Sequence, residues 1–263
     1  MDFLYWQPLE YIAIVLVALM VAAAEAGFRI GQRLKRLGAD DSPLGTMQSA
    51  LLALLGLLLA FTFGMANARF EMRKELVLTE ANNIGTASLR MDMLREPWRS
   101  RSREMMLQYV RDRVEFYSNP ETSDDQEALI ALVSSVSAHQ SGLWEQAVAA
   151  AASDPHDHMV ALYVDALNAV IDIHSSRIAA SRNHVPETTL VLLGILAIAC
   201  AMSLGQSCGS SGHRHFGATT VFSLLITLVV VVVMDLDRPR RGYIHVPQTP
   251  LIELLADLEK APR

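Results

Sequence analysis

Hydrophobic residues along the chain gather in four long runs that are separated by polar stretches. A bilayer core of roughly 30 Å is crossed by about 20 mostly apolar helical residues. The runs that reach or approach this length are Tyr11–Gly27, Ser49–Ala66, Thr188–Leu204 and Ala218–Met234. The pattern therefore predicts four transmembrane helices. The connections within the first pair and within the last pair are short, so we expect each pair to form an antiparallel hairpin.

The segment between the second and third runs contains no spanning run but has helical periodicity throughout. The second run continues into it without a break, and two rows of residues recur there every seven positions. The first row is Phe70, Val77, Ile84 and Met91, and the second is Arg73, Glu80, Ala87 and Leu94. At about 1.5 Å per residue, a helix over Met47–Arg95 would be roughly 75 Å long. A helix of this length must project into water.

Further amphipathic helices are predicted at Arg101–Tyr117, Gln126–Ala152, Asp157–Arg182 and Pro250–Lys260. The chain is thus expected to be an all-α membrane protein, with four transmembrane helices in two hairpins and a water-exposed helical domain inserted between spans 2 and 3. The predicted domains are a first hairpin at 1–67, a helical domain at 68–186, a second hairpin at 187–234 and a tail at 235–263.

Composition supports the membrane assignment and removes several functional classes. The 263 residues are 51% hydrophobic and only 19% charged, and the formal net charge of −6 disfavours nucleic-acid binding. No basic residue precedes the first run, which argues against a cleaved signal peptide. Cys200 and Cys208 form neither a disulfide framework nor a metal-ligand spacing. No cofactor is expected.

The orientation in the membrane has two conflicting interpretations. The four basic residues of the first loop argue that this loop is cytoplasmic. The opposite side, however, carries more arginine and lysine near the span ends. The count therefore favours a cell inner membrane protein with the helical domain and both termini in the cytoplasm.

Three separated blocks of the sequence resemble one known family. The blocks are LLGLLLAFTFGMANARFEMRKELVLTEANNIGTASLRMDML, ALNAVIDIHSSRIAASRNHVP and MDLDRPRRGYIHV. In this order they look like the bacterial membrane family called bestrophin-like, over about Leu51 to Val246. No established activity comes with that family.

A more distant similarity is to the bestrophin anion channels. Their second span also leads through a Gly/Phe-rich end into a long amphipathic helix, as Phe61, Ala68, Arg69 and Phe70 do here. The resemblance implies a homo-oligomer, a pentamer in the channels, with membrane lipid and small anions as partners. It also implies a neck lined by Ala53, Leu57 and Phe61.

The sequence departs from the channel pattern at two positions. Thr62 replaces the usual Arg, and Gly64 takes the place of an Asn. The chain also lacks a dense acidic run of the kind that holds calcium in those channels. The resemblance therefore does not extend to ion selectivity or calcium dependence.

Several polar groups are candidates for function, and each has a structural alternative. Leu57 and Phe61 share one helix face and suit a dewetting constriction, or they are ordinary lipid-facing or packing residues. Glu80, Asn83 and Arg90 suit a vestibule, or they form solvated or inter-subunit salt bridges.

The remaining candidates lie near the span ends or in the inserted segment. Glu25 is interpreted as an interfacial ion pair with Arg29. The cluster after span 4 suits a clasp, a lipid-headgroup contact or a plain stop-transfer flank; it contains Asp235, Asp237, Arg238 and Pro239. Asp165, Asp172 and His174 are disfavoured as metal ligands, because Asp172 and His174 point to different helix faces.

No nucleophile elbow, P-loop, dinucleotide turn or paired-His zinc motif occurs in the sequence, which disfavours an enzyme. The leading hypothesis is an oligomeric channel, conducting small anions along an axis formed by second-span helices. The alternative is a non-conducting membrane scaffold or sensor whose helical domain binds a soluble partner.

Overall fold

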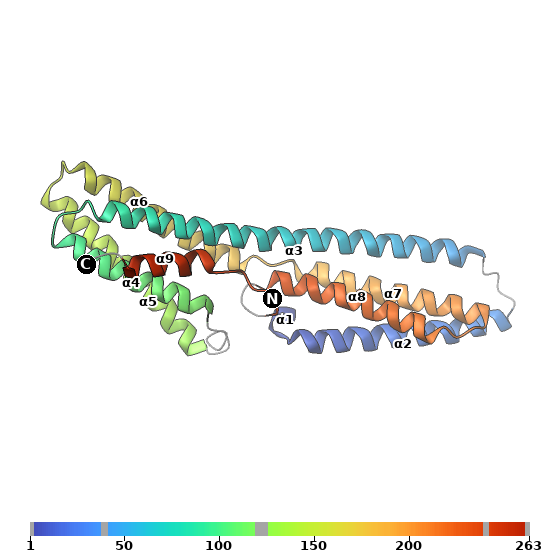
Figure 1. Cartoon of the computed structure of the whole chain (residues 1–263). Helices are drawn as coiled ribbons and strands as arrows, with labels where there is room; N and C mark the ends of the chain where they lie inside the picture. The colour runs from blue at the N-terminus through green and yellow to red at the C-terminus, as the bar shows by residue number, and fades with distance from the viewer. Residues whose placement is uncertain (1–2, 38–41, 119–125, 239–241, 261–263) are drawn as a thin grey trace. The chain divides into compact units, whose positions relative to one another are not determined.

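The structure is a computed structural model that describes residues 3–37, 42–118, 126–238 and 242–260 (Figure 1). No strand occurs among these residues. Its helices are α1 (Phe3–Trp6), α2 (Leu9–Arg36), α3 (Ser42–Met91), α4 (Trp98–Ser118), α5 (Gln126–Ser153), α6 (His158–Arg182), α7 (Glu187–Ser211), α8 (Phe216–Asp237) and α9 (Thr249–Lys260). The predicted all-helical class is confirmed.

Four helical stretches are long and apolar enough to cross a membrane, which confirms the number of predicted spans among the described residues. They are α2, α3, the stretch His158–Ser211 that contains α7, and α8. The chain is accordingly a multi-pass membrane protein.

Helix α3 is a single helix of 50 residues. Pro43 lies in its first turn, where a missing N–H removes no intrahelical hydrogen bond. No other proline occurs before Pro97, and the isolated glycines do not interrupt the backbone hydrogen bonding. The sequence predicted one unbroken helix over Met47–Arg95. The observed helix begins earlier, at Ser42, and ends earlier, at Met91.

The chain divides into two compact units. One, here called the membrane unit, comprises Met1–Arg69, His184–Arg238 and Gly242–Ile244. The other, the helical unit, comprises chiefly Phe70–Asn183 and His245–Arg263. Helix α3 contributes its first part to the membrane unit and its second part to the helical unit.

Within the membrane unit, α2 and α7 run parallel and make close backbone contact (Figure 1). A Cβ atom added to Gly27 or Gly31 would overlap the carbonyl oxygens of Met202 and Gln206. A Cβ atom added to Gly205 or Gly209 would overlap those of Ala24 and Phe28. Each helix thus presents a Gly-x-x-x-Gly pair to the other, the arrangement that lets membrane helices approach closely. This pairing between spans 1 and 3 was not predicted.

In the helical unit, α3 and α6 run antiparallel and are joined by side-chain hydrogen bonds. Arg73 on α3 donates hydrogen bonds to the carbonyl oxygens of Ala180 (3.1 Å) and Asn183 (2.8 Å). Further along α3, Asn83 donates to the carbonyl oxygen of Ala169 at 3.1 Å. Because higher numbers on α3 meet lower numbers on α6, the two helices run in opposite directions.

The core of the helical unit contains the heptad rows that the sequence indicated. Seven of their eight residues are buried, and Phe70 is half-buried. Tyr109 of α4, Leu143 of α5, Leu167 of α6 and Leu251 of α9 join the same cluster. The small apolar face predicted for the C-terminal helix therefore packs on this core.

Candidate functional site

The three neck candidates lie on one face of α3 that the subunit itself leaves uncovered. Leu57 is 54% exposed and Phe61 is 63% exposed, and Ala53 is also exposed. On the other side of the same helix segment, Leu55 is buried within the membrane unit. The candidate face is therefore not covered by the rest of the subunit.

Thr62 lies one residue beyond Phe61, at the position where the channel pattern has an arginine. Its side chain is buried, and its hydroxyl donates to the carbonyl oxygen of Leu58 at 2.6 Å. This hydrogen bond satisfies the hydroxyl within the helix. The position thus contributes no fixed charge to the uncovered face.

A charged cluster lies at the centre of the helical unit. Glu80 of α3 is fully buried and accepts hydrogen bonds from Arg113 of α4, at 2.9 and 3.1 Å, and from Arg177 of α6. The hydroxyl of Tyr109 lies 3.4 Å from the same carboxylate. One acidic side chain thereby links three helices.

The pKa values in this cluster follow from burial and charge. Glu80 lies outside the apolar part of α3, in a segment rich in charged residues. Burial alone would raise its pKa, but the guanidinium groups of Arg113 and Arg177 outweigh that effect and lower it. Glu80 in turn raises the pKa of Arg113 against the opposing effect of burial. The cluster is therefore ionised at neutral pH.

A neighbouring imidazole behaves differently. His174 of α6 is buried next to the cluster, and burial together with the charge of Arg113 lowers its pKa to about 4. The ring is therefore neutral at physiological pH. Asp165, Asp172 and His174 do not form a metal site: no group of three potential ligands occurs among the described residues.

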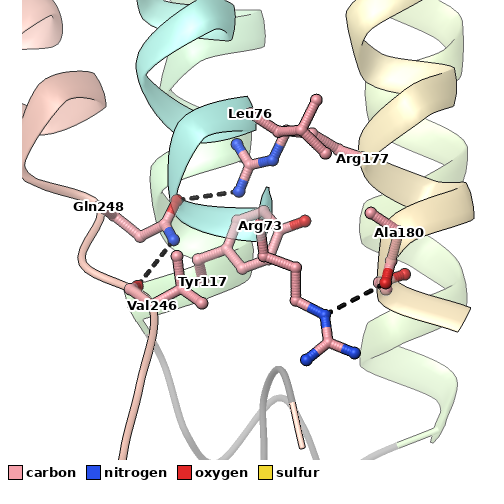
Figure 2. Close-up of a pocket in the computed structure, with 8 residues that line it drawn as sticks. Arg73, Leu76, Tyr117, Arg177, Ala180, Val246 and Gln248 are labelled. Carbon is pink, nitrogen blue, oxygen red and sulfur yellow. Dashed lines mark hydrogen bonds between the residues drawn. The ribbon is translucent and has the colours of Figure 1, made fainter. Parts of the chain in front are cut away.

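A small, partly open cavity lies beside this cluster (Figure 2). Arg177 lines it and donates to the side-chain oxygen of Gln248 at 3.1 Å, and its guanidinium lies 4.3 Å from the ring centre of Tyr117. Arg73 approaches from α3 and bonds to Ala180. The cavity thus adjoins the contacts that hold α3, α4, α6 and the C-terminal segment together.

The other two vestibule candidates also have partners within the subunit. Asn83 bonds to α6 as described above, and Arg90 bonds to the carbonyl oxygen of Leu162 (2.8 Å) and to Asp165 (3.0 Å). Arg90 remains partly exposed, whereas Glu80 does not. Asn83 is partly exposed as well, so Glu80 is the one of the three that is closed to solvent.

The acidic cluster after span 4 joins three segments of the membrane unit. Asp237 accepts hydrogen bonds from the hydroxyl of Tyr5 (2.5 Å) and from the backbone N–H of Val185 (2.6 Å). The ring of His184 stacks on that of Tyr5 at 4.4 Å, and burial and the bond to Asp237 raise the pKa of Tyr5. The start of α7 is thereby tied to α1 and to the end of α8.

Two neighbouring residues extend this clasp. Asp235 accepts from the backbone N–H groups of Tyr243 and Ile244, both at 2.8 Å, and Arg238 donates to the carbonyl oxygens of Leu4 and Gln7. Pro239, the fourth residue predicted here, lies outside the described residues. The sequence indicated the cluster but not its partners, since these are up to about 234 positions away.

Glu25 forms the predicted ion pair with Arg29, at 2.9 Å. It also accepts from Arg214 of the loop before α8, at 2.8 and 2.9 Å. The second arginine was missed, because it lies 189 residues away in the sequence.

The arrangement as a whole defines a class: a four-span helical membrane protein whose second span continues into a buried helix of a separate helical unit. The family model of the bestrophin-like domain matches residues 12–251. The chain therefore belongs to the bestrophin-like family, as the three sequence blocks indicated.

Solved structures agree with this assignment at the level of the fold. A bacterial bestrophin homologue from Klebsiella pneumoniae is 14% identical, and the match covers 94% of this chain and 96% of that chain with a TM-score of 0.64. A single-residue variant of that homologue matches at 12% identity over 94% and 99% of the two chains, with a TM-score of 0.68. A structure described as a membrane protein variant matches at 12% over 95% and 99%, with a TM-score of 0.70. The comparison with curated protein sequences finds no match.

Proposed function

We propose that this protein is a homo-oligomeric channel of the inner membrane that conducts small anions along an axis lined by α3. The observation that carries the proposal is the uncovered face of Ala53, Leu57 and Phe61, found on the one spanning helix that continues into the helical unit. Membership in the bestrophin-like family adds to it, because the bestrophins that the sequence resembles are anion channels.

In a symmetric oligomer, this face of each subunit can line a shared pathway. If identical α3 helices surround an axis, residues four apart form successive apolar rings. Leu57 and Phe61 are large, so their rings would be the narrowest. A dry constriction of this kind raises the barrier to ions and acts as a gate. Thr62 brings no charge to it, so anion preference would come from elsewhere along the path.

The helical unit would form the wall of a cytoplasmic vestibule, with the termini on the same side. Arg90 is the residue we assign to the vestibule surface, since it is partly exposed and carries a positive charge. Glu80 supports this wall from within by fixing α3 to α4 and α6. Buried charge pairs of this kind hold helices in one register.

Chloride flux from liposomes tests the proposal. We expect wild-type protein to release chloride, and the double variant Leu57→Ala/Phe61→Ala to release it faster, because smaller side chains widen and wet the neck. Oligomer mass is compared in both samples. The matched control is Phe63→Ala, an exposed residue two positions beyond Phe61 and therefore on a different face of α3, which should leave flux unchanged.

Absence of flux from intact wild-type oligomer would contradict the channel and favour the alternative, a scaffold whose helical unit binds a soluble partner. Flux that is equally raised by Phe63→Ala would contradict the assignment of the neck but not of the channel.

A further inference from the structure

A groove opens at the end of the membrane unit where α2 and α7 end and α8 begins. We call it the interfacial groove and define it by its lining residues Val21, Ala24, Glu25, Phe28, Gly205, Cys208, Arg214, His215, Phe216 and Thr219. The set divides into an apolar part and a charged part.

The charged part carries an excess of positive charge. Arg214 of the groove and Arg29 beside it both bind the carboxylate of Glu25, so one negative charge is shared by two positive charges. The arginine side chains are 71% and 60% exposed, and Arg214 lies over the ring of Phe28 at 4.8 Å. Three more exposed cations follow on α2, namely Arg33, Lys35 and Arg36.

The apolar part comes from two of the predicted spans, and its accessible residues are Val21 and Phe216, because Ala24 and Phe28 are buried. Val21, Ala24 and Phe28 belong to the spanning helix α2, and Phe216 is a large exposed residue at the first turn of α8. Both helices are long and apolar enough to cross the bilayer. The groove therefore lies between apolar residues of the predicted spans and exposed arginines near their ends.

We propose that the interfacial groove binds an anionic phospholipid. The phosphate group would bind Arg214 and Arg29, which offer several N–H donors and a positive charge. An acyl chain would lie against Val21 and Phe216, the accessible apolar residues of the groove. A zwitterionic lipid carries its own ammonium group next to the phosphate and gains less from the cations, so the site prefers a net negative headgroup. This inference does not depend on whether the protein conducts.

Glu25 gives the proposal a distinctive consequence. Its carboxylate occupies the same guanidinium groups that the lipid phosphate needs, so it competes with the lipid. Neutralising Glu25 should strengthen lipid binding, whereas neutralising Arg214 should weaken it. A purely structural ion pair predicts no such opposition, because removal of either partner would only destabilise the groove.

The test is a titration of the purified full chain in mild detergent with phosphatidylglycerol or with phosphatidylcholine of the same acyl chains. Native mass spectrometry counts the bound lipids, and melting temperature reports stabilisation. We expect phosphatidylglycerol to bind more tightly than phosphatidylcholine. Arg214→Gln should weaken phosphatidylglycerol binding about fivefold, since each interfacial cation contributes roughly that factor. Glu25→Gln should strengthen it.

The control is Arg111→Gln in the helical unit, which removes an equally charged, half-exposed arginine that is paired with Glu259. This variant should leave lipid binding unchanged. If the lipid were attracted only by the net charge of the protein, Arg111→Gln would weaken binding as much as Arg214→Gln does. Arg214→Lys retains the charge and should recover part of the affinity. Equal binding of the two lipids by the wild type, or a shift in the same direction for Glu25→Gln and Arg214→Gln, would overturn the proposal.

Discussion

At the scale of single residues, Glu80 holds the helical unit together. Replacing it with alanine leaves Arg113 and Arg177 buried without their carboxylate, and breaking a buried pair in this way costs about 3–5 kcal/mol. We expect a lower urea midpoint for Glu80→Ala. Glu71→Gln is the control: that residue is exposed and pairs with Lys74 at the surface, so its loss should cost about 1 kcal/mol or less. Similar midpoints for both variants would contradict the role of the cluster.

His174 makes stability depend on pH. In the unfolded chain its pKa is near 6.5, whereas burial and Arg113 lower the pKa to about 4 in the folded protein. The unfolded state therefore binds a proton that the folded state does not, and stability falls as pH drops from about 6.5 to about 4. Melting temperature measured across this range should fall less steeply for His174→Gln than for the wild type. Equal slopes would show that the ring is not buried in neutral form.

The hydrogen-bond and charge partners of these residues could not be predicted from the sequence. Spacing along α3 marked Glu80 as one of a polar set on a long helix. Its arginines lie 33 and 97 positions away on other helices, and no periodicity relates them. Other arginines lie close to Arg113 and Arg177 in the sequence and would have been equally reasonable partners for Glu80. Only the fold selects Arg113 and Arg177.

At the scale of elements, the glycine contact fixes α2 against α7. Gly205→Ala adds a methyl group that would overlap the backbone of Ala24, and overpacking of this kind costs about 1–3 kcal/mol. Gly194→Ala on the same helix is the matched control, because nothing lies near its added Cβ atom. The control should be neutral or stabilising by up to about 1 kcal/mol. Melting in detergent distinguishes the two, and equal effects would contradict the close contact.

Helices were predicted well and their pairing was not. Long apolar runs and heptad rows give strong local signals, and proline and capping residues mark the ends, as Asp157 does by accepting from the N–H of Met159 at 2.8 Å. The hairpin prediction rested only on short loops. The two Gly-x-x-x-Gly pairs, at Gly27–Gly31 and Gly205–Gly209, were visible in the sequence and would have indicated contact between spans 1 and 3.

At the scale of the whole molecule, the orientation proposed above places the helical unit in the cytoplasm. A variant without Cys200 and Cys208 that carries Asn82→Cys, an exposed position on α3, should resist an impermeant maleimide added to intact cells and react after permeabilisation. The physical reason is the larger number of basic residues beside the spans on that side. A cysteine replacing Arg36, at the end of α2, should give the opposite result. Reaction of the Asn82→Cys variant in intact cells would invert the orientation.

The central claim is that α3 lines an axial pathway in a homo-oligomer, and a cryo-electron microscopy map of the full chain in lipid nanodiscs tests it most directly. We expect a ring of identical subunits in which Ala53, Leu57 and Phe61 face the axis. The radius of the axial path should be smallest at Leu57 and Phe61. A map in which these side chains face lipid, or in which the subunits enclose no axial path, would contradict it.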